Sequence, residues 1–203
     1  MRIAWKRGGL GLALAAVLAL AAVRLCAHGP AKEPEIALLI GEPYEAMRQR
    51  SSAVIDPAIP NTEWYNIPHS DARLRFIDKQ YGFITPLASF FTVSYMEGVI
   101  DSVRMSPQVE PLLLDDTLKI VLDLQAQLRK GGWVPIKAQE YPPFADTPQW
   151  RAQLRDVNKG GTAYWQAGDR YQVMLDVNRF KDNSHPTEER YLISLDLAKP
   201  WVE

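Results

Sequence analysis

Apolar and polar residues alternate in two stretches near the C-terminus of the chain. One stretch has Tyr171, Val173, Leu175 and Val177 as its apolar set, and the other has Tyr191, Ile193, Leu195 and Leu197. Alternation with a period of two predicts β-strands with one buried face and one wetter face. A polar loop, 181–189, separates the two stretches, so we expect two strands of an antiparallel sheet there.

Further strands are predicted upstream. The run 72–76 alternates Leu and Phe with Arg, and the runs 90–95 and 99–105 flank a Glu97-Gly98 turn, a pattern typical of a β-hairpin. Shorter strands are predicted at 133–136 and 162–166.

The middle of the chain has a helical pattern. Asp115 or Asp116 is placed to cap its start, Lys130 lies in its last turn and Gly131-Gly132 follows. The pattern predicts a long helix that packs its apolar stripe against the sheet. That stripe consists of Leu118, Val121, Leu122, Leu124 and Leu128.

Two shorter helices are also predicted. Thr147-Pro148 opens one of them, Trp150 and Leu154 lie one turn apart in it, and Gly160-Gly161 ends it. A brief helix is expected at 45–50.

These elements predict an α+β fold, a mostly antiparallel sheet with one long helix packed on it, in residues 72–203. Residues 28–71 are expected to be a linker and an irregular N-terminal segment, since three prolines lie between Ile55 and Pro68. Residues 1–27 precede it as an N-terminal apolar anchor or signal helix.

The first 27 residues have the pattern of an export signal. Residues 1–7 carry three cations, and Gly8–Val23 contains only Gly, Ala, Leu and Val. The cations keep the N-terminus in the cytoplasm, which sends the following domain into the periplasm. Residues 8–27 then either stay as an inner-membrane anchor or are cleaved, and lipidation of Cys26 is a further alternative.

Charge and cysteine content restrict the partners of the body of the chain. Beyond residue 30 the chain has 19 basic and 24 acidic side chains, which argues against a nucleic-acid partner because binding phosphates needs clustered cations. Cys26 is the one cysteine, so no internal disulfide and no cysteine-based zinc site can form. With 47% hydrophobic residues, the chain is not disordered throughout.

No motif in the sequence identifies a reaction. The histidines, His28, His69 and His185, are scattered, and no serine lies in a Gly-x-Ser-x-Gly turn. Asp115-Asp116 is better explained as a helix cap and Glu188-Glu189 as part of a solvated loop. We therefore expect no catalytic residue, no metal site and no cofactor.

Three aromatic clusters near polar or proline-rich segments are candidates for binding a protein or a carbohydrate. Core packing is the alternative for each of them. The candidates are Trp64, Tyr65, Tyr141, Phe144, Tyr164 and Trp165.

Four phrases of the sequence carry a resemblance to a known group of proteins. They are Ser106–Leu112, Gly131–Trp133, Phe144–Arg151 and Asn158–Tyr171. Over residues 72–203 the chain resembles small exported or membrane-anchored proteobacterial proteins that accompany type VI secretion effectors as immunity proteins. The resemblance implies an inhibitor that sequesters a toxin entering the periplasm, and it carries over no binding residues.

The leading hypothesis is therefore a non-enzymatic periplasmic protein that binds another protein, for which a toxic effector is the candidate. The first alternative is a module that binds an envelope glycan or has a structural role in the envelope. The second is a hydrolase whose acidic and histidine residues converge only in three dimensions.

Overall fold

The computed structural model describes residues 33–184 and 186–202, which form an α+β fold. Its helices are α2 (Tyr44–Arg50), α3 (Leu114–Lys130) and α4 (Pro148–Arg155). Its strands are β1 (Glu35–Leu38), β2 (Glu63–Asn66), β3 (Ala72–Phe76), β4 (Phe83–Ala88), β5 (Phe91–Met96), β6 (Val99–Met105), β7 (Val134–Ile136), β8 (Gly161–Ala167), β9 (Tyr171–Phe180) and β10 (Arg190–Ala198).

The strands form two sheets. The large sheet has seven strands in the order β2-β5-β6-β10-β9-β8-β7, and each pair of adjacent strands is antiparallel. The small sheet has the order β1-β3-β4, with β1 parallel to β3. The prediction of a mostly antiparallel α+β fold is thus confirmed.

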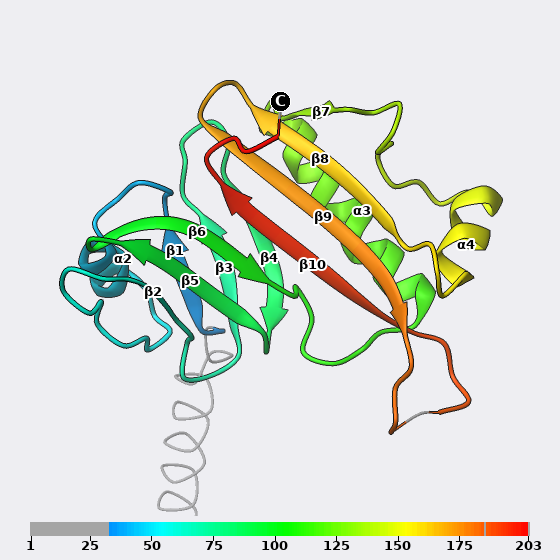
Figure 1. Cartoon of the computed structure of the whole chain (residues 1–203), viewed down its shortest axis with the longest axis horizontal. Helices are drawn as coiled ribbons and strands as arrows, with labels where there is room; N and C mark the ends of the chain where they lie inside the picture. The colour runs from blue at the N-terminus through cyan, green and yellow to red at the C-terminus, as the bar shows by residue number, and fades with distance from the viewer. Residues whose placement is uncertain (1–32, 185, 203) are drawn as a thin grey trace, which may run out of the picture. The chain divides into compact units, whose positions relative to one another are not determined.

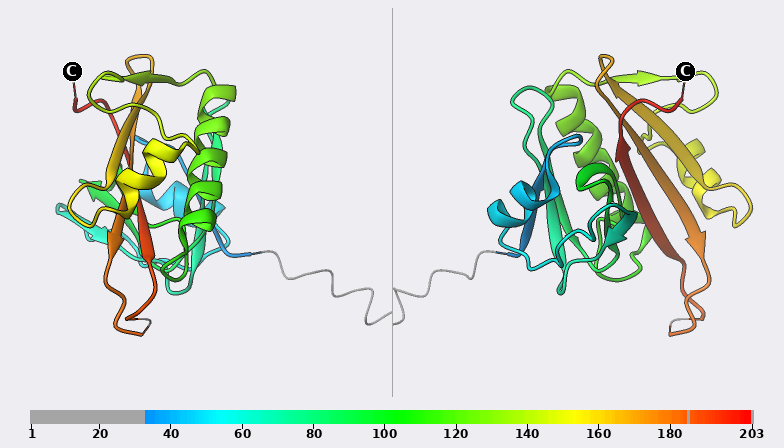
Figure 2. Two further views of the ribbon diagram at one scale, coloured as in Figure 1. Left: turned by 90° about the vertical axis from the view of Figure 1, so that its right-hand side faces the viewer. Right: turned by 60° about the vertical axis from the view of Figure 1, so that its left-hand side comes forward.

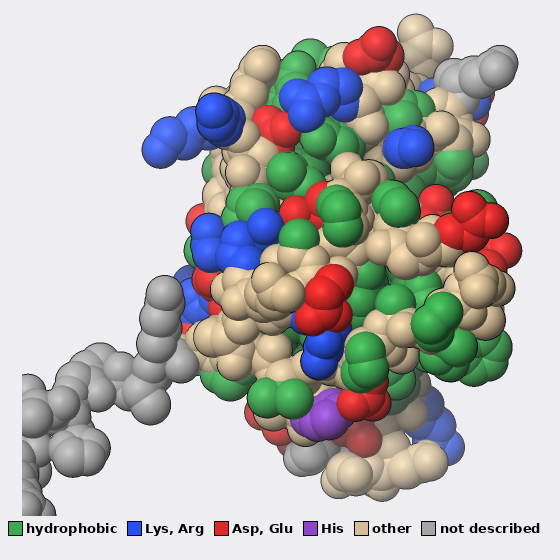
Figure 3. Space-filling view, turned by 90° about the vertical axis from the view of Figure 1, so that its left-hand side faces the viewer, with side chains coloured by type: hydrophobic (Ala, Val, Ile, Leu, Met, Phe, Trp, Pro, Cys, Tyr) green, Lys and Arg blue, Asp and Glu red, His purple; other side chains and the backbone are tan. Residues whose placement is uncertain are grey.

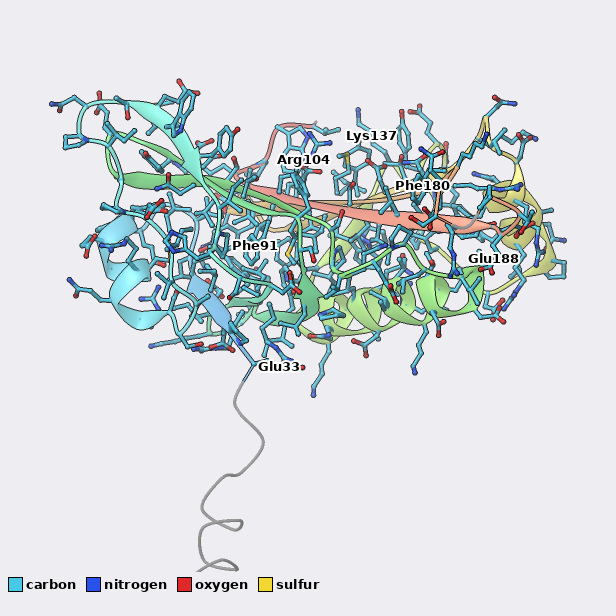
Figure 4. The ribbon with its side chains drawn as sticks, turned by 90° about the horizontal axis from the view of Figure 1, so that it is seen from below. Glu33, Phe91, Arg104, Lys137, Phe180 and Glu188 are labelled. Carbon is cyan, nitrogen blue, oxygen red and sulfur yellow. The ribbon has the colours of Figure 1, made fainter. Side chains whose placement is uncertain are left out.

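One face of the large sheet is covered by a second layer. Figure 1 shows α3 behind the long strands β8, β9 and β10, and the small sheet behind β5 and β6. Figure 4 shows the same two layers from below, with Phe91 of β5 in the interior between them and Arg104 of β6 on the opposite side of the sheet. We call that opposite side the open face of the large sheet.

Helix α3 covers the sheet with the predicted stripe. Leu118, Val121, Leu124 and Leu128 are buried, whereas Leu122 is only partly buried beside the core. The predicted cap is wrong, because the N-cap residue is Leu113 and no side chain caps the helix. Asp115 and Asp116 lie inside the first turn, where a carboxylate favours the positive end of the helix dipole.

Helix α4 begins as predicted but ends earlier. The Thr147 hydroxyl accepts the Trp150 backbone N–H at 3.3 Å, and the helix ends at Arg155, before Gly160. Gly161 serves packing instead, since a Cβ there would lie 2.7 Å from the Trp150 ring and 2.8 Å from the Phe144 ring.

From Glu35 onward, the segment 28–71 contains regular secondary structure, so the prediction of an irregular linker is wrong there. It contributes β1, α2 and β2, and one compact unit begins at Glu33 rather than at residue 72. The short helix predicted at 45–50 is confirmed as α2. The strand β1 could not be anticipated, because its parallel partner β3 lies about 40 residues further along the chain and local pattern does not report such pairing.

The apolar anchor expected at residues 1–27 lies outside the described residues. Within residues 33–184 and 186–202, no helix is both long enough and apolar enough to cross a membrane.

An aromatic and ionic cluster joins the two layers. Phe76, Phe83, Trp133 and Tyr171 pack against one another with ring centroids 5.0 to 6.4 Å apart. Beside them lies Asp78, whose side chain is 6% exposed.

Asp78 is held by four donors. One carboxylate oxygen accepts the backbone N–H groups of Gln80 and Tyr81 at 2.9 and 3.0 Å, and the other accepts from Arg170 at 2.8 Å and from the Tyr171 hydroxyl at 3.3 Å. Burial raises the pKa of Asp78, but these donors and the Arg170 charge outweigh it, so the pKa lies below its ordinary value.

We expect Leu124→Ala to lower the free energy of unfolding by about 3 kcal/mol, because it leaves a cavity in the core under α3. Leu122→Ala is the matched control and should cost about 1 kcal/mol, since that side chain keeps water on one side. Urea denaturation of both variants measures the difference. Equal losses would show that the stripe is assigned to the wrong side of the helix.

We expect Asp78→Asn to lower the free energy of unfolding by about 2 kcal/mol at pH 7, since it removes the charge that Arg170 and two backbone N–H groups stabilise. The folded pKa is lowered, so this stability is present above the unfolded pKa of about 3.9 and is lost as the pH falls through the folded pKa. The difference between the two proteins should therefore shrink in denaturation series below about pH 4. A difference independent of pH would contradict this account.

Candidate functional site

Two of the predicted binding residues are exposed on β2, an edge strand of the large sheet. Trp64 is 55% exposed and Tyr65 is 46% exposed, and their rings are stacked with centroids 5.5 Å apart. The side chains of neighbouring residues leave a strand on opposite faces of the sheet. Two such rings can stack only where they meet around the outer edge, so this pair places aromatic surface along the edge of β2.

Two other predicted residues meet on the opposite half of the open face. Tyr141, in the loop after β7, packs edge-on against Tyr164 of β8 with ring centroids 5.2 Å apart. Both rings are partly accessible, and burial raises the pKa of Tyr164.

The remaining two predicted residues are buried, so for them core packing is the correct explanation. Phe144 lies against Trp150, and its backbone N–H and carbonyl are both hydrogen-bonded by the Gln125 side chain of α3 at 2.9 Å. Trp165 is on the covered face of β8, where the Arg129 guanidinium lies 4.9 Å from its ring centroid. Neither ring can contact a partner at the surface.

Large apolar side chains gather around Trp64 and Tyr65. We call this group the β2 surface, and Figure 3 shows hydrophobic side chains gathered at the right of this end of the molecule. Contiguous exposed apolar patches of this kind mark interaction sites more often than scattered single residues do. The β2 surface consists of Ile59, Trp64, Tyr65, Ile67, Phe90 and Met96.

The loop before β2 is fastened underneath the strand. The Asn66 amide donates to the Tyr44 hydroxyl at 3.1 Å and to the carbonyls of Asp56 and Pro57 at 3.0 and 3.1 Å. The Tyr95 hydroxyl accepts the backbone N–H of Ile59 at 2.9 Å. These bonds hold β2 in a defined position although three of its four side chains are exposed.

A pocket of about 430 Å³ adjoins the β2 surface on the open face. Its apolar wall comes from β2 and from the turn before β5, and its floor is polar. The lining residues are Tyr65, Ile67, Phe90, Thr92, Ser94, Ser102, Arg104 and Asp196. A smaller pocket of about 190 Å³ shares Ser102 and Asp196 with it and is closed by Met174 and Trp201.

Asp196 lies where the two pockets meet. Arg104 approaches it at 3.5 Å, but the second carboxylate oxygen is buried and accepts no hydrogen bond from the described residues. Burial raises the pKa of Asp196, Arg104 opposes that shift and the charge of Asp176 adds to it. The carboxylate therefore has an unused acceptor at the centre of the open face.

The histidines and acidic pairs do not form a catalytic site in the described part of the chain. His69 Nε2 lies 3.0 Å from Asp56 Oδ1, but the two side chains are 54% and 68% exposed and line no pocket described above. His28 and His185 lie outside the described residues. Glu188 pairs with Arg190, and Glu189 accepts the Tyr191 hydroxyl at 3.1 Å. No group of three or more possible metal ligands occurs within residues 33–184 and 186–202.

The sequence pattern does not single out the pocket residues Ile67, Phe90, Arg104 and Asp196. Phe90 and Arg104 belong to the predicted hairpin, and Asp196 alternates with the apolar residues Leu195 and Leu197 of the last predicted strand. The sequence pattern does not show that β6 and β10 are neighbouring strands. This pairing places Arg104 opposite Asp196.

We expect the Asp196 carboxyl to titrate above the ordinary aspartate pKa of about 3.9, and to titrate higher still in Arg104→Gln, which removes the opposing cation. The folded state then binds more protons than the unfolded state, so the contribution of this group to stability falls as the pH rises from about 3.9 through the folded pKa. Carbon-13 NMR titration of the carboxyl measures both values. A pKa at or below 3.9, or a lower pKa in the variant, would contradict this assignment.

Comparisons of the chain with protein-family models, with curated proteins and with solved structures found no match.

Proposed function

We propose that this protein is a non-enzymatic protein-binding module of the bacterial envelope, held in the periplasm by its N-terminal segment, which binds and neutralises a toxic effector. The observation that carries the proposal is the β2 surface, which sets exposed Trp64 and Tyr65 beside the pocket that contains Arg104 and Asp196. Aromatic residues next to a few polar groups are typical of the centre of a protein interface.

The charge of the chain favours a basic partner. An excess of acidic residues beyond residue 30 accelerates the encounter with a positively charged protein more than it strengthens the final complex. The type VI immunity role rests on the resemblance given above, and inner-membrane anchoring through residues 8–27 rests on the cations and the apolar run of the leader.

Binding of an envelope glycan is the second candidate function. It is favoured by the stacked pair of Trp64 and Tyr65, because exposed aromatic rings provide flat surfaces on which sugar rings can pack. A hydrolase is less well supported, since His69 and Asp56 are more than half exposed and lack a surrounding cleft.

The proposal is tested by affinity capture from envelope extracts of the source bacterium together with a deletion strain. We expect one stoichiometric protein partner, and a deletion strain that neighbouring cells of the same lineage poison. The double variant Trp64→Ala/Tyr65→Ala should weaken capture at least about tenfold, as expected when central aromatic residues are truncated. Val134→Ala, an exposed residue on the opposite edge strand β7, is the control and should leave capture unchanged.

Failure to capture a protein, together with unchanged sensitivity of the deletion strain, would refute the toxin-binding role. Saturable binding to purified peptidoglycan that is lost in Trp64→Ala would support the glycan alternative. Trp165→Ala is unsuitable as a probe in either assay, because that ring is buried.

A further inference from the structure

The two sheets have four outer edges, and the edge of β1 is closed by its own chain. The hydroxyls of Ser52 and Ser51 accept the backbone N–H groups of Glu35 and Ala37, each at 3.0 Å. The carbonyl of Ala37 accepts from the Arg50 guanidinium at 2.9 Å. The segment after α2 thus takes the place of a neighbouring strand.

The edges of β4 and β7 are closed in other ways. The Gln127 side chain of α3 pairs with β4 like a strand backbone, accepting the Ile84 N–H at 2.9 Å and donating to the Ile84 carbonyl at 3.0 Å. Strand β7 has only three residues, contains Pro135 and is followed by exposed Lys137. Short length, proline and lysine are the devices by which proteins prevent strand addition at an edge.

Strand β2 is also short, with four residues, but the described residues provide no hydrogen-bonded cover for it. Glu63, Trp64 and Tyr65 are exposed, the strand contains neither Pro nor Lys, and no described side chain or loop hydrogen-bonds to its outer backbone. The carbonyl of Thr62 accepts the N–H of Glu97 at 3.1 Å, so residue 62 faces β5. Alternation along an antiparallel pair then turns the backbone groups of Glu63 and Tyr65 outward.

The charges at this end of the sheet select the occupant. Glu63 of β2, Glu97 of the β5–β6 turn and Asp101 of β6 are exposed, and none of them forms an ion pair within the described residues. The cations Arg48 and Arg104 near this end each already have an acidic partner: Arg48 pairs with Glu45 at 2.7 Å, and Arg104 lies 3.5 Å from Asp196. A second copy of this chain would bring two sets of these carboxylates together, whereas a basic strand would neutralise them.

From the contrast among the four edges we infer that β2 is a strand-addition site, which extends the large sheet by one extended segment of a basic partner protein. The backbone of the added segment pairs with the outward N–H and carbonyl groups of Glu63 and Tyr65, and its apolar side chains cover Trp64, Tyr65 and Ile67. This inference deepens the proposed function and rests on it, since it names how the partner is recognised and the chemistry of the recognised segment.

The test uses the full chain in a non-ionic detergent and a defined probe, a blocked ten-residue peptide of alternating Val and Lys. Amide hydrogen exchange is followed by NMR at Glu63 and Tyr65, whose N–H groups we expect to be unprotected in the free protein because they point away from β5. We expect both amides to become protected when the peptide saturates the protein. The same peptide N-methylated at alternate residues should not protect them, because it lacks donors for the edge.

Matched variants distinguish the contribution of the Tyr65 backbone to peptide binding from that of its side chain. Tyr65→Ala and Tyr65→Pro both remove the ring, but only Pro also removes an outward N–H, and it leaves the pairing with β5 intact. We expect Tyr65→Pro to bind the Val–Lys peptide about tenfold more weakly than Tyr65→Ala. The proline variant loses one hydrogen bond to the peptide, and its pyrrolidine ring obstructs the added strand. Unchanged exchange protection in β9 and β10 shows that both variants are folded.

Three outcomes would overturn the inference. The first is that Glu63 and Tyr65 stay unprotected at saturating peptide, or that the Pro and Ala variants bind it equally. The second is that an alternating Val–Glu peptide binds as tightly as the Val–Lys peptide. The third is protection without peptide that grows with protein concentration alongside a dimer in sedimentation, which would make a second copy the occupant.

The same variants keep this inference separate from the proposed function. A natural partner captured equally by Tyr65→Pro and Tyr65→Ala would leave the protein-binding function in place and refute strand addition. Conversely, peptide-dependent protection in a protein that captures no envelope partner would refute the function and retain the site.

Discussion

The apolar face of a seven-stranded sheet needs a cover, and none of the three helices in the described part of the chain can supply it alone. Strands lie about 4.8 Å apart, so the sheet is roughly 30 Å wide, whereas one helix covers a width of about 10 Å. Helix α3 covers the long strands β8 to β10, and the small sheet of β1, β3 and β4 covers β5 and β6. The two covers contact each other through α3 and β4, where Gln127 bonds to the backbone of Ile84. The N-terminal part of the body is therefore an essential half of the second layer.

The same constraint leaves the other face of the sheet without a cover. Figure 2 shows from two further directions that α3 and the small sheet lie on one side of the large sheet. The open face has mostly polar side chains on its central strands, although Met174 lies beside Asp196 there. Exposed or partly exposed aromatic side chains lie toward both of its edges, Tyr141 and Tyr164 near β8 and Trp64 and Tyr65 on β2. The open face carries a pocket of mixed polarity, a carboxylate oxygen of Asp196 that accepts no hydrogen bond from the described residues, and exposed aromatic side chains.

The fold stabilises the ionised form of one buried aspartate, Asp78, and disfavours that of the partly buried Asp196. Asp78 receives donors on both oxygens at the junction of the layers, so its ionised form stabilises the native state. Asp196 has one cation at 3.5 Å and one oxygen without a hydrogen bond from the described residues, and its burial disfavours the ionised form. The edges of the sheets show the same contrast, since three are closed by the chain and β2 is not.

The sequence by itself determined the elements whose pattern is local. The alternation of β9 and β10, the Glu97-Gly98 hairpin, the Thr147 cap of α4 and all of the α3 stripe except Leu122 depend on residues a few positions apart, and they follow from the sequence. Only the tertiary structure decided what depends on contacts between distant residues. The pairing of β1 with β3, the burial of Phe144 and Trp165, the exposure of Trp64 and Tyr65, and the meeting of Arg104 with Asp196 are of this kind. An aromatic side chain has the same local pattern in a core as on a rim, because only the layer packed above it determines whether water reaches the ring.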